Sequence, residues 1–375
     1  MKRKHDAAFS DDCFKRIPKD CEDRIMMFLN TVDLCRTLAA ASSRMRDLAY
    51  EGKNWRKIKI IGVQNQRTLS ILDLHGRKMD TLTFYGMRIS RGMSDMFSKC
   101  KRLSSLDMTG IWKSPAVNYR FVNAIRHLPL RRLLFGQNEV QDQGFNLLCD
   151  SLSHTLEELD FNSRTVSSES LCNVHLMIKL KSLCMRSCVK LNDQVVEGIS
   201  SLPVLETLQL SFLPGLHCSS LKHVYGSHCE MSQKLQTLVL NGMHVDRERL
   251  AALSAMTNLR IVSLCHSTLH SNDLYFFRPP RLQSLTVFCA NQLCAFDFLQ
   301  NLPHLRMLCL YRCSFSVRSL QKWAKRRPEL MMRIFAPRPL RDGGVLVEDD
   351  TIDYDSHENI KKMYVVRRPY PVFYC

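Results

Sequence analysis

The chain has 375 residues, of which 45% are hydrophobic and 24% are charged, and its formal net charge at pH 7 is +17. This length and hydrophobic content can bury a large core, which excludes an intrinsically disordered chain. No apolar run approaches the ~18 to 20 residues of a membrane-spanning helix, so we expect no association with a membrane. The chain has 16 cysteines, some of them inside apolar segments such as Leu308-Cys309-Leu310. No secretory signal is recognisable, so we expect free buried thiols and a cytoplasmic or nuclear protein.

A basic segment, residues 1–13, opens the chain. Positive charge is otherwise spread along the sequence, and only residues 322–327 form a dense cluster. Spread charge is ordinarily a solvated surface. It also favours an acidic partner, either a protein with acidic or phosphorylated patches or, as the alternative, a nucleic acid.

Residues 14–60 are predicted to form a small all-α domain. Pro18 suits the first turn of a helix, and Asp33 can cap a second helix that starts at Leu34 and has Leu38 on its apolar face. The segment resembles the F-box, a helical motif with Leu-Pro at its start, Asp-Leu in its middle and Leu-Trp near its end. The residues that carry the resemblance are Ile17-Pro18, Ile25, Leu29, Asp33-Leu34, Arg44, Leu48-Ala49 and Trp55. The residues that depart from the family's pattern are Cys21, Glu22, Met26 and Met45.

Residues 61–335 repeat the pattern Leu-x-x-Leu-x-Leu, with apolar substitutes, about ten times at intervals of roughly 23 to 30 residues. The copies are Met79/Leu82/Phe84, Leu103/Leu106/Met108, Leu130/Leu133/Phe135, Leu156/Leu159/Phe161, Leu180/Leu183/Met185, Leu205/Leu208/Leu210, Leu235/Leu238/Leu240, Leu259/Val262/Leu264, Leu282/Leu285/Val287 and Leu305/Leu308/Leu310. The last two apolar residues of a copy alternate along a short strand and point inward. One unit cannot bury its own apolar face, so the stack is the folding unit.

Helices are expected between the strands. Residues 66–76 are predicted to form the helix that precedes the first strand. Within the array, helical spacing of apolar residues predicts helices at 193–202, 219–224 and 317–324. In the turns after the strands, the residues placed to cap the backbone from inside are Asn138, Cys188 and Cys313.

The stretch 180–193 resembles a cysteine-containing leucine-rich repeat, and an F-box followed by such repeats is the layout of the F-box and leucine-rich-repeat family. The resemblance implies an α/β solenoid, with short parallel strands on its concave face and helices on its convex face, behind a small all-α head. It implies a non-catalytic substrate-recognition subunit of a Skp-cullin-F-box ubiquitin ligase. The head would bind the Skp adaptor, and through it a cullin-RING ligase, while the solenoid would bind an unknown protein substrate.

The resemblance to the F-box implies that the adaptor-binding residues are Ile17, Pro18, Ile25, Leu29, Leu34 and Leu38. Two alternatives stay open. The head is a helical cap on the open end of the solenoid, or the chain is a leucine-rich-repeat scaffold that is not coupled to a ligase and associates with nucleic acid.

The concave face is the candidate substrate site, because solenoids use this surface for binding, and aromatic residues and Arg are typical interface anchors. The predicted substrate-binding residues are Tyr85, Arg186, Phe212, Phe288, Tyr311 and Arg312. Further outward positions on this face are Gln209, Cys265, Thr286 and Cys309.

Other chemistry has weaker signals. Cys184/Cys188 and Cys309/Cys313 have a zinc-ligand spacing, but the first of each pair is expected on an outward strand position and the second inside a turn, so structural thiols are favoured over a metal site. No phosphate-binding loop or nucleophile elbow occurs. We therefore expect neither a cofactor nor catalysis.

Residues 336–375 are predicted to be a tail that begins as a linker and contains an acidic stretch at 348–358. One interpretation is a loosely packed tail. The other is that the acidic stretch folds back onto basic solenoid surface and competes with a substrate.

Overall fold

The computed structural model describes residues 17–28, 43–61, 65–87, 97–111, 118–217, 230–243, 245–265, 269–290, 293–335 and 363–365. Its 13 strands form a sheet in which strand order follows chain order. The chain divides into two compact units, Met1–Asn138 and Glu139–Cys375. Parallel strands alternate with helices in both units, so the predicted α/β repeat architecture is confirmed.

Unit 1 contains the N-terminal helices and the first strands. Its elements are α1 (Lys19–Phe28), α4 (Ser43–Tyr50), η3 (Gly52–Trp55), β1 (Lys57–Ile61), α5 (Asn65–His75), η4 (Gly76–Lys78), β2 (Thr81–Met87), η5 (Phe97–Lys99), β3 (Ser105–Ile111), α7 (Tyr119–Ile125) and β4 (Arg132–Glu139), which ends at the unit boundary. β2 pairs in parallel with β1 and β3, and Leu82 lies beside Ile58 on one side and Leu106 on the other. All three side chains are buried.

The first strand lies earlier than predicted. β1 falls inside the segment 14–60 that we expected to be all-α, and the predicted helix, α5, lies between β1 and β2 rather than before the first strand. Trp55, Ile58 and Ile60 reproduce the spacing of the repeat and are buried. The register places Ile60 beside Phe84. Residues that resemble the end of an F-box therefore belong to the first repeat of the array.

Trp55 joins the helix before it to the helix after β1. Its indole nitrogen donates to the carbonyl oxygen of Ala49 at 2.8 Å. Its ring stacks on His75 of α5, with ring centroids 3.4 Å apart and planes 12° apart. Tyr50, the last residue of α4, stacks on the same imidazole at 5.5 Å. These contacts attach α4 to the first repeat.

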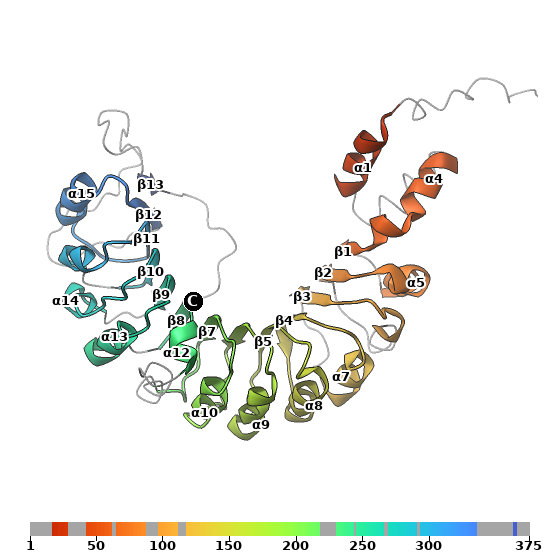
Figure 1. The fold of residues 1–375 in the computed structure, drawn as a ribbon, viewed down its shortest axis with the longest axis horizontal. Coiled ribbons are helices and arrows are strands. Elements are labelled where there is room, and N and C mark those ends of the chain that lie inside the picture. The colour runs from red at the N-terminus through yellow and green to blue at the C-terminus, as the bar shows by residue number, and fades with distance from the viewer. Residues whose placement is uncertain are drawn as a thin grey trace, which may run out of the picture. The chain divides into compact units, whose positions relative to one another are not determined.

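Unit 2 continues the repeats. Its elements are α8 (Asp142–Leu152), β5 (Glu158–Asn162), α9 (Ser168–Cys172), η6 (Asn173–Leu176), β6 (Ser182–Arg186), α10 (Val195–Ser200), β7 (Thr207–Ser211), α12 (Glu230–Lys234), β8 (Thr237–Asn241), α13 (Arg247–Leu253), β9 (Ile261–Cys265), α14 (Ser271–Leu274), β10 (Ser284–Phe288), η7 (Asp297–Asn301), β11 (Met307–Tyr311), α15 (Val317–Arg326), β12 (Met331–Phe335) and β13 (Met363–Val365). Within this unit the strands line the inner side and the helices the outer side (Figure 1).

Side-chain alternation along the strands builds the core of unit 2. Leu208 and Leu210 of β7 are fully buried, whereas Gln209 between them points to the other face. Backbone hydrogen bonds recur in register before each strand. The nitrogens of Lys181 and Ser182, for example, donate to the carbonyl oxygen of Glu157 at 2.8 and 3.0 Å. Each repeat is thereby fixed to its neighbour through both apolar packing and the backbone.

Helix starts in unit 2 follow the capping rules. The side chains of Ser167, Asp246 and Ser316 accept hydrogen bonds from the first turns of α9, α13 and α15. α10 and α15 confirm two of the predicted helices, and the third, at 219–224, lies outside the described residues.

Two strands lie beyond the ten-copy pattern. β12 pairs with β11, and β13, from the predicted tail 336–375, pairs in parallel with β12. The acidic stretch at 348–358 lies outside the described residues. Among the described helices, none has the length and apolar character of a membrane span.

Candidate functional site

The strand face of unit 2 is defined here by the outward positions of β5 to β12. Each of these strands presents three such positions, at its start, middle and end. The end positions of β6 to β11 form one row, which we call the terminal row: Arg186, Ser211, Asn241, Cys265, Phe288 and Tyr311. Three predicted substrate-binding residues, Arg186, Phe288 and Tyr311, belong to this row.

An aromatic pair dominates the C-terminal part of the terminal row. Phe288 and Tyr311 are register partners on β10 and β11, and their rings stack with centroids 4.6 Å apart and planes 20° apart. Both residues are half-buried. Burial raises the pKa of Tyr311, and the nearby Arg333 partly offsets the increase. The pair is an apolar platform that solvent still reaches.

Arg186, at the other end of the row, is already neutralised. Its guanidinium forms an ion pair with Asp160 on β5, and both side chains are largely buried. Burial raises the pKa of Asp160, and Arg186 partly offsets that increase. Burial also raises the pKa of the adjacent Cys184 to about 12. This end of the face is a closed polar cluster rather than an available anchor.

Phe212 and Arg312, which are predicted outward positions of the concave face, lie in the turns that follow β7 and β11 and not on the strands. Both have positive φ, 54° and 50°. Phe212 is half-buried, and its ring packs over Gly242, where an added Cβ would lie 2.8 Å from the ring. Arg312 is exposed directly after the aromatic pair. The structure therefore brings together Phe288, Tyr311 and Arg312, and places Phe212 at the rim of the strand face.

Tyr85 lies in unit 1, on β2, where it is the register partner of Ile61 on β1. It is 56% exposed. The ammonium group of Lys59 on β1 lies 5.4 Å from the centroid of its ring. Tyr85 is an accessible aromatic residue within its own unit.

The cysteines on and below the strand face are structural. Cys265 and Cys309, which were predicted to be outward positions of the concave face, are only 7% exposed. Cys188 and Cys313 are buried in their turns, and their thiols donate to the carbonyl oxygens of Arg186 and Tyr311 at 3.4 and 3.3 Å. Burial raises the pKa of Cys188 to about 12. These thiols cap the turns, as predicted.

Asn138 has the same capping role in unit 1, where its amide donates to the carbonyl oxygens of Phe135 and Met108 at 2.5 and 3.3 Å. Within the described part of the chain, no group of three or more His, Cys, Asp or Glu residues could hold a metal ion.

The predicted adaptor-binding residues are described only in part. Ile17 is half-buried, Pro18 is exposed, and Ile25 on α1 is 39% exposed, whereas the adjacent Met26 is buried. The other three, Leu29, Leu34 and Leu38, lie outside the described residues. Pro18, directly before α1, and Ile25, on α1, are therefore exposed to solvent.

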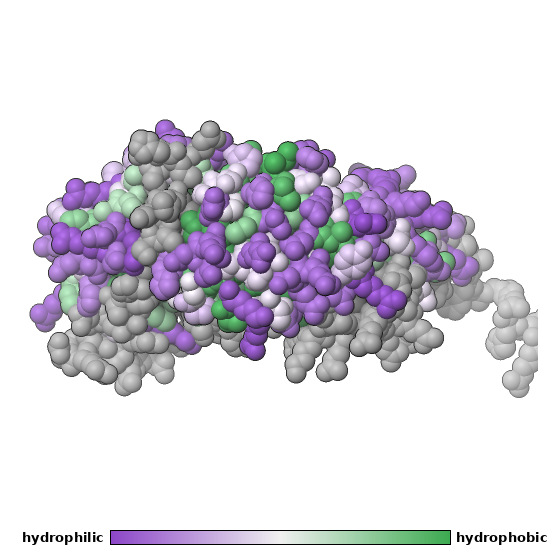
Figure 2. Space-filling view, turned by 90° about the horizontal axis from the view of Figure 1, so that it is seen from below, coloured by the Kyte–Doolittle hydropathy of each residue, from purple (hydrophilic) through white to green (hydrophobic). Residues whose placement is uncertain are grey.

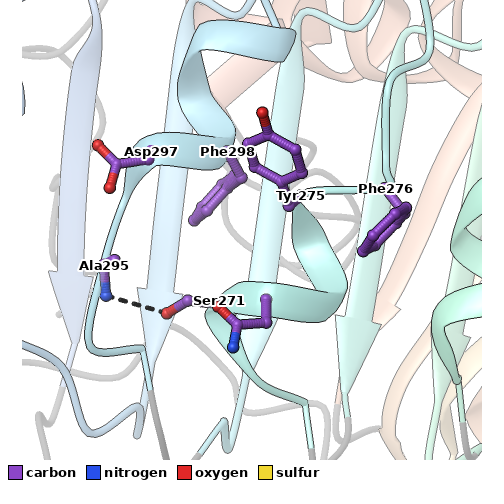
Figure 3. Close-up of a pocket in the computed structure, with 7 residues that line it drawn as sticks. Ser271, Tyr275, Phe276, Ala295, Asp297 and Phe298 are labelled. Atoms are coloured by element: carbon purple, nitrogen blue, oxygen red, sulfur yellow. Dashed lines mark hydrogen bonds between the residues drawn. The ribbon is translucent and has the colours of Figure 1, made fainter.

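A cavity of about 320 Å³ lies on the helix side of unit 2 (Figure 3). It is lined by Ser271, Asn272, Tyr275, Phe276, Ala295, Asp297 and Phe298. Two of its polar side chains have partners within the repeats. Ser271 Oγ accepts from the nitrogen of Ala295 at 3.1 Å, and Asp297 accepts from Trp323 Nε1 at 3.3 Å. Because these bonds join neighbouring repeats, the cavity is a gap between repeats.

The surface seen in Figure 2, from below the view of Figure 1, is mostly hydrophilic, and hydrophobic residues appear there only in small groups. Scattered apolar residues of this kind are ordinary on a protein surface. The surface in Figure 2 thus offers no large hydrophobic patch, and the strand face of unit 2, with its stacked aromatic pair, is the stronger candidate for binding.

No protein-family model and no curated protein matches the sequence. Solved structures do match. The chain is similar to the structure of the Rad7 and Elc1 complex in yeast, with 14% identity over 84% of this chain and 93% of that chain and a TM-score of 0.51. It is also similar to an internalin from Listeria monocytogenes, with 14% identity over 73% and 87% of the two chains and a TM-score of 0.43. At these identities the likeness concerns the fold, which is that of a leucine-rich-repeat protein.

Proposed function

We propose that this protein is a non-catalytic adaptor of a ubiquitin ligase, acting in the cytoplasm or nucleus. Its N-terminal helices would bind the Skp adaptor of a cullin-RING ligase, and the strand face of unit 2 would bind a protein substrate. The observation that carries the proposal is the stacked pair Phe288 and Tyr311, held half-exposed on the strand face next to Arg312. Aromatic and arginine side chains dominate the binding energy of protein interfaces.

The N-terminal helices support the proposed binding of the Skp adaptor. α1 begins directly after Pro18, and Ile25 is exposed where an internal core residue would be buried. An aliphatic side chain exposed on a helix can insert into a partner's pocket. The similarity to a structure in which Rad7 was solved with a second protein, Elc1, is in keeping with this role.

The test is recovery of the Skp adaptor with the full chain. The double variant Pro18→Ala, Ile25→Asp should recover at least about tenfold less adaptor than the natural sequence, because a charge at a packed contact costs roughly 1.4 kcal/mol or more. The matched control is Leu74→Asp on α5, which also places a charge at an exposed leucine, 72% exposed. It should leave recovery unchanged.

Failure of the natural chain to recover the adaptor would reject coupling to the ligase. The second candidate function, a leucine-rich-repeat interaction scaffold without a ligase, would then remain. Equal loss of adaptor in Leu74→Asp and in the double variant would show that the binding is not at α1.

A further inference from the structure

Charge is distributed unevenly over the strand face of unit 2. Although 24% of the chain is charged, no outward position from β7 to β11 carries a charge. These positions are Thr207, Gln209, Ser211, Thr237, Val239, Asn241, Ile261, Ser263, Cys265, Ser284, Thr286, Phe288, Met307, Cys309 and Tyr311. Depletion of charge is the compositional mark of the core of a protein interface. An uncharged surface also loses little solvation energy when a partner covers it.

Two polar atoms in this uncharged strip lack partners within the described part of the chain. They are Ser211 Oγ and Asn241 Oδ1, whose residues are register partners at the ends of β7 and β8. Ser211 is only 3% exposed. A buried polar atom without a hydrogen bond is unfavourable, and it is satisfied when a partner donates to it. Both residues lie in the terminal row, so a ligand that lies along that row and displaces the atoms covering them would satisfy both.

Two arginines lie at the opposite end of the strip. Arg333 is the register partner of Cys309 and points outward from β12. Arg312 follows Tyr311. Both are exposed, and neither forms an ion pair with an acid among the described residues. The strip therefore ends in an aromatic pair flanked by two positive charges.

We propose that the terminal row binds an extended segment of a partner protein that carries an aromatic or aliphatic side chain next to a carboxylate. The side chain packs on Phe288 and Tyr311, the carboxylate lies against Arg312 and Arg333, and backbone N–H groups of the segment donate to Asn241 and Ser211. This inference rests on the proposed function, because it names the class of its substrate. Four strand spacings separate Ser211 from Tyr311, roughly 19 Å, which about six extended residues can cross.

A nucleic acid fits this surface less well than an acidic peptide. Aromatic residues and Arg also bind single-stranded nucleic acid, but that binding needs positive charge along the whole path of the backbone. The strip from β7 to β11 offers none. Only one end of the row is basic, which matches one acidic group on an otherwise uncharged segment.

The experiment measures binding of fluorescent polymers to the full chain by anisotropy. The acidic aromatic probe is the random copolymer poly(Glu,Tyr). The comparison probes are poly(Glu), poly(Lys,Tyr) and oligouridine. We expect poly(Glu,Tyr) to bind most tightly. Arg312→Ala with Arg333→Ala should weaken it about tenfold or more, because two charge-assisted contacts are lost. Phe288→Ala should remove most of the preference for poly(Glu,Tyr) over poly(Glu).

The control variants remove the same number of positive charges, or one aromatic ring, from helices and not from the strand face. Arg120→Ala with Arg318→Ala removes two exposed arginines, and Tyr119→Ala removes an exposed aromatic ring, 53% exposed. Each should change binding of poly(Glu,Tyr) less than about twofold, since these sites lie outside the proposed contact.

Three results would overturn the inference: equal weakening by the control arginines, equal or tighter binding of poly(Lys,Tyr), or tighter binding of oligouridine that depends on Phe288. The same preparations are assayed for recovery of the Skp adaptor. A chain that recovers the adaptor but fails the polymer test refutes only the substrate class. A chain that passes the polymer test without recovering the adaptor refutes only the coupling to a ligase.

Discussion

One backbone position recurs at the ends of the strands. The residue directly after the last outward residue has positive φ in successive repeats, as in Ser187 (52°), Gly242 (70°), Cys289 (56°) and Arg312 (50°). This left-handed conformation costs a residue other than glycine roughly 1 kcal/mol. It turns the chain away from the strand, and so it places side chains such as those of Phe212 and Arg312 at the rim.

Gly242 tests this geometry. Gly242→Ala should lower the free energy of unfolding by about 2 to 3 kcal/mol, because it combines the left-handed strain with a contact 2.8 Å from the Phe212 ring. The matched control is Gly86→Ala, at φ +64° with no atom within 4 Å of an added Cβ. It should cost only about 1 kcal/mol. Chemical denaturation measures both, and equal losses would contradict the steric contribution of Phe212.

The buried pair Arg186 and Asp160 predicts a pH dependence. Arg186→Ala leaves an unpaired buried carboxylate and should cost about 3 to 5 kcal/mol at neutral pH. Burial already raises the pKa of Asp160, and loss of Arg186 raises it further. As pH falls through that raised pKa, Asp160 becomes neutral, so the deficit of the variant should shrink.

Denaturation of Arg186→Ala against the natural chain, from neutral pH down toward pH 4, measures this effect. In the background Asp160→Asn, the cost of Arg186→Ala should no longer depend on pH. If the stability lost on Arg186→Ala stays constant with pH in the chain that retains Asp160, then the carboxylate of Asp160 is not the group that makes the substitution unfavourable.

At the scale of elements, the stack of Trp55 on His75 joins α4 to the first repeat. Burial, and then Lys78, lower the pKa of His75 to about 4 from 6.5. The folded chain therefore resists protonation that the unfolded chain accepts below pH 6.5. Stability from this group is complete above pH 6.5 and is lost as pH falls toward 4.

His75→Phe should keep an aromatic ring in the stack but remove this titration. Between pH 6.5 and about 4, the natural chain should lose about 1 to 3 kcal/mol more stability than the variant. Thermal melts across this range give the comparison. Parallel pH profiles for the two proteins would mean that His75 accepts a proton without leaving its place in the stack.

The sequence predicted the elements whose signal is periodic. Ten strands follow from recurring inward leucines, because an inward position must be apolar in every repeat. β1 was missed, since Trp55 fits both the end of an F-box and the anchor of a repeat, and nothing local distinguishes these. β13 has only three residues, Met363–Val365, and no repeat pattern.

The part of the candidate site that depends only on how the strands align could be predicted from the sequence. Register alone places Phe288 beside Tyr311. It does not reveal that a left-handed turn moves Phe212 off its strand, or that Asp160 already pairs with Arg186. The unpartnered atoms of Ser211 and Asn241 depend on three-dimensional neighbours, so no sequence signal marks them.

At the scale of the whole molecule, the two proposed binding surfaces belong to two different parts of the chain. α1 belongs to unit 1, and the terminal row belongs to unit 2. The two surfaces have no residue in common, and mutations without shared partners usually act independently. Loss of one binding activity should therefore leave the other intact.

The most direct measurement is a quantitative affinity purification of three tagged chains from cells: the natural sequence, Pro18→Ala with Ile25→Asp, and Phe288→Ala with Arg333→Ala. We expect the first variant to lose the Skp adaptor but retain the substrate, and the second variant to lose the substrate but retain the adaptor. Loss of both partners in either variant, or of neither partner in both, would contradict the assignment of the two binding surfaces.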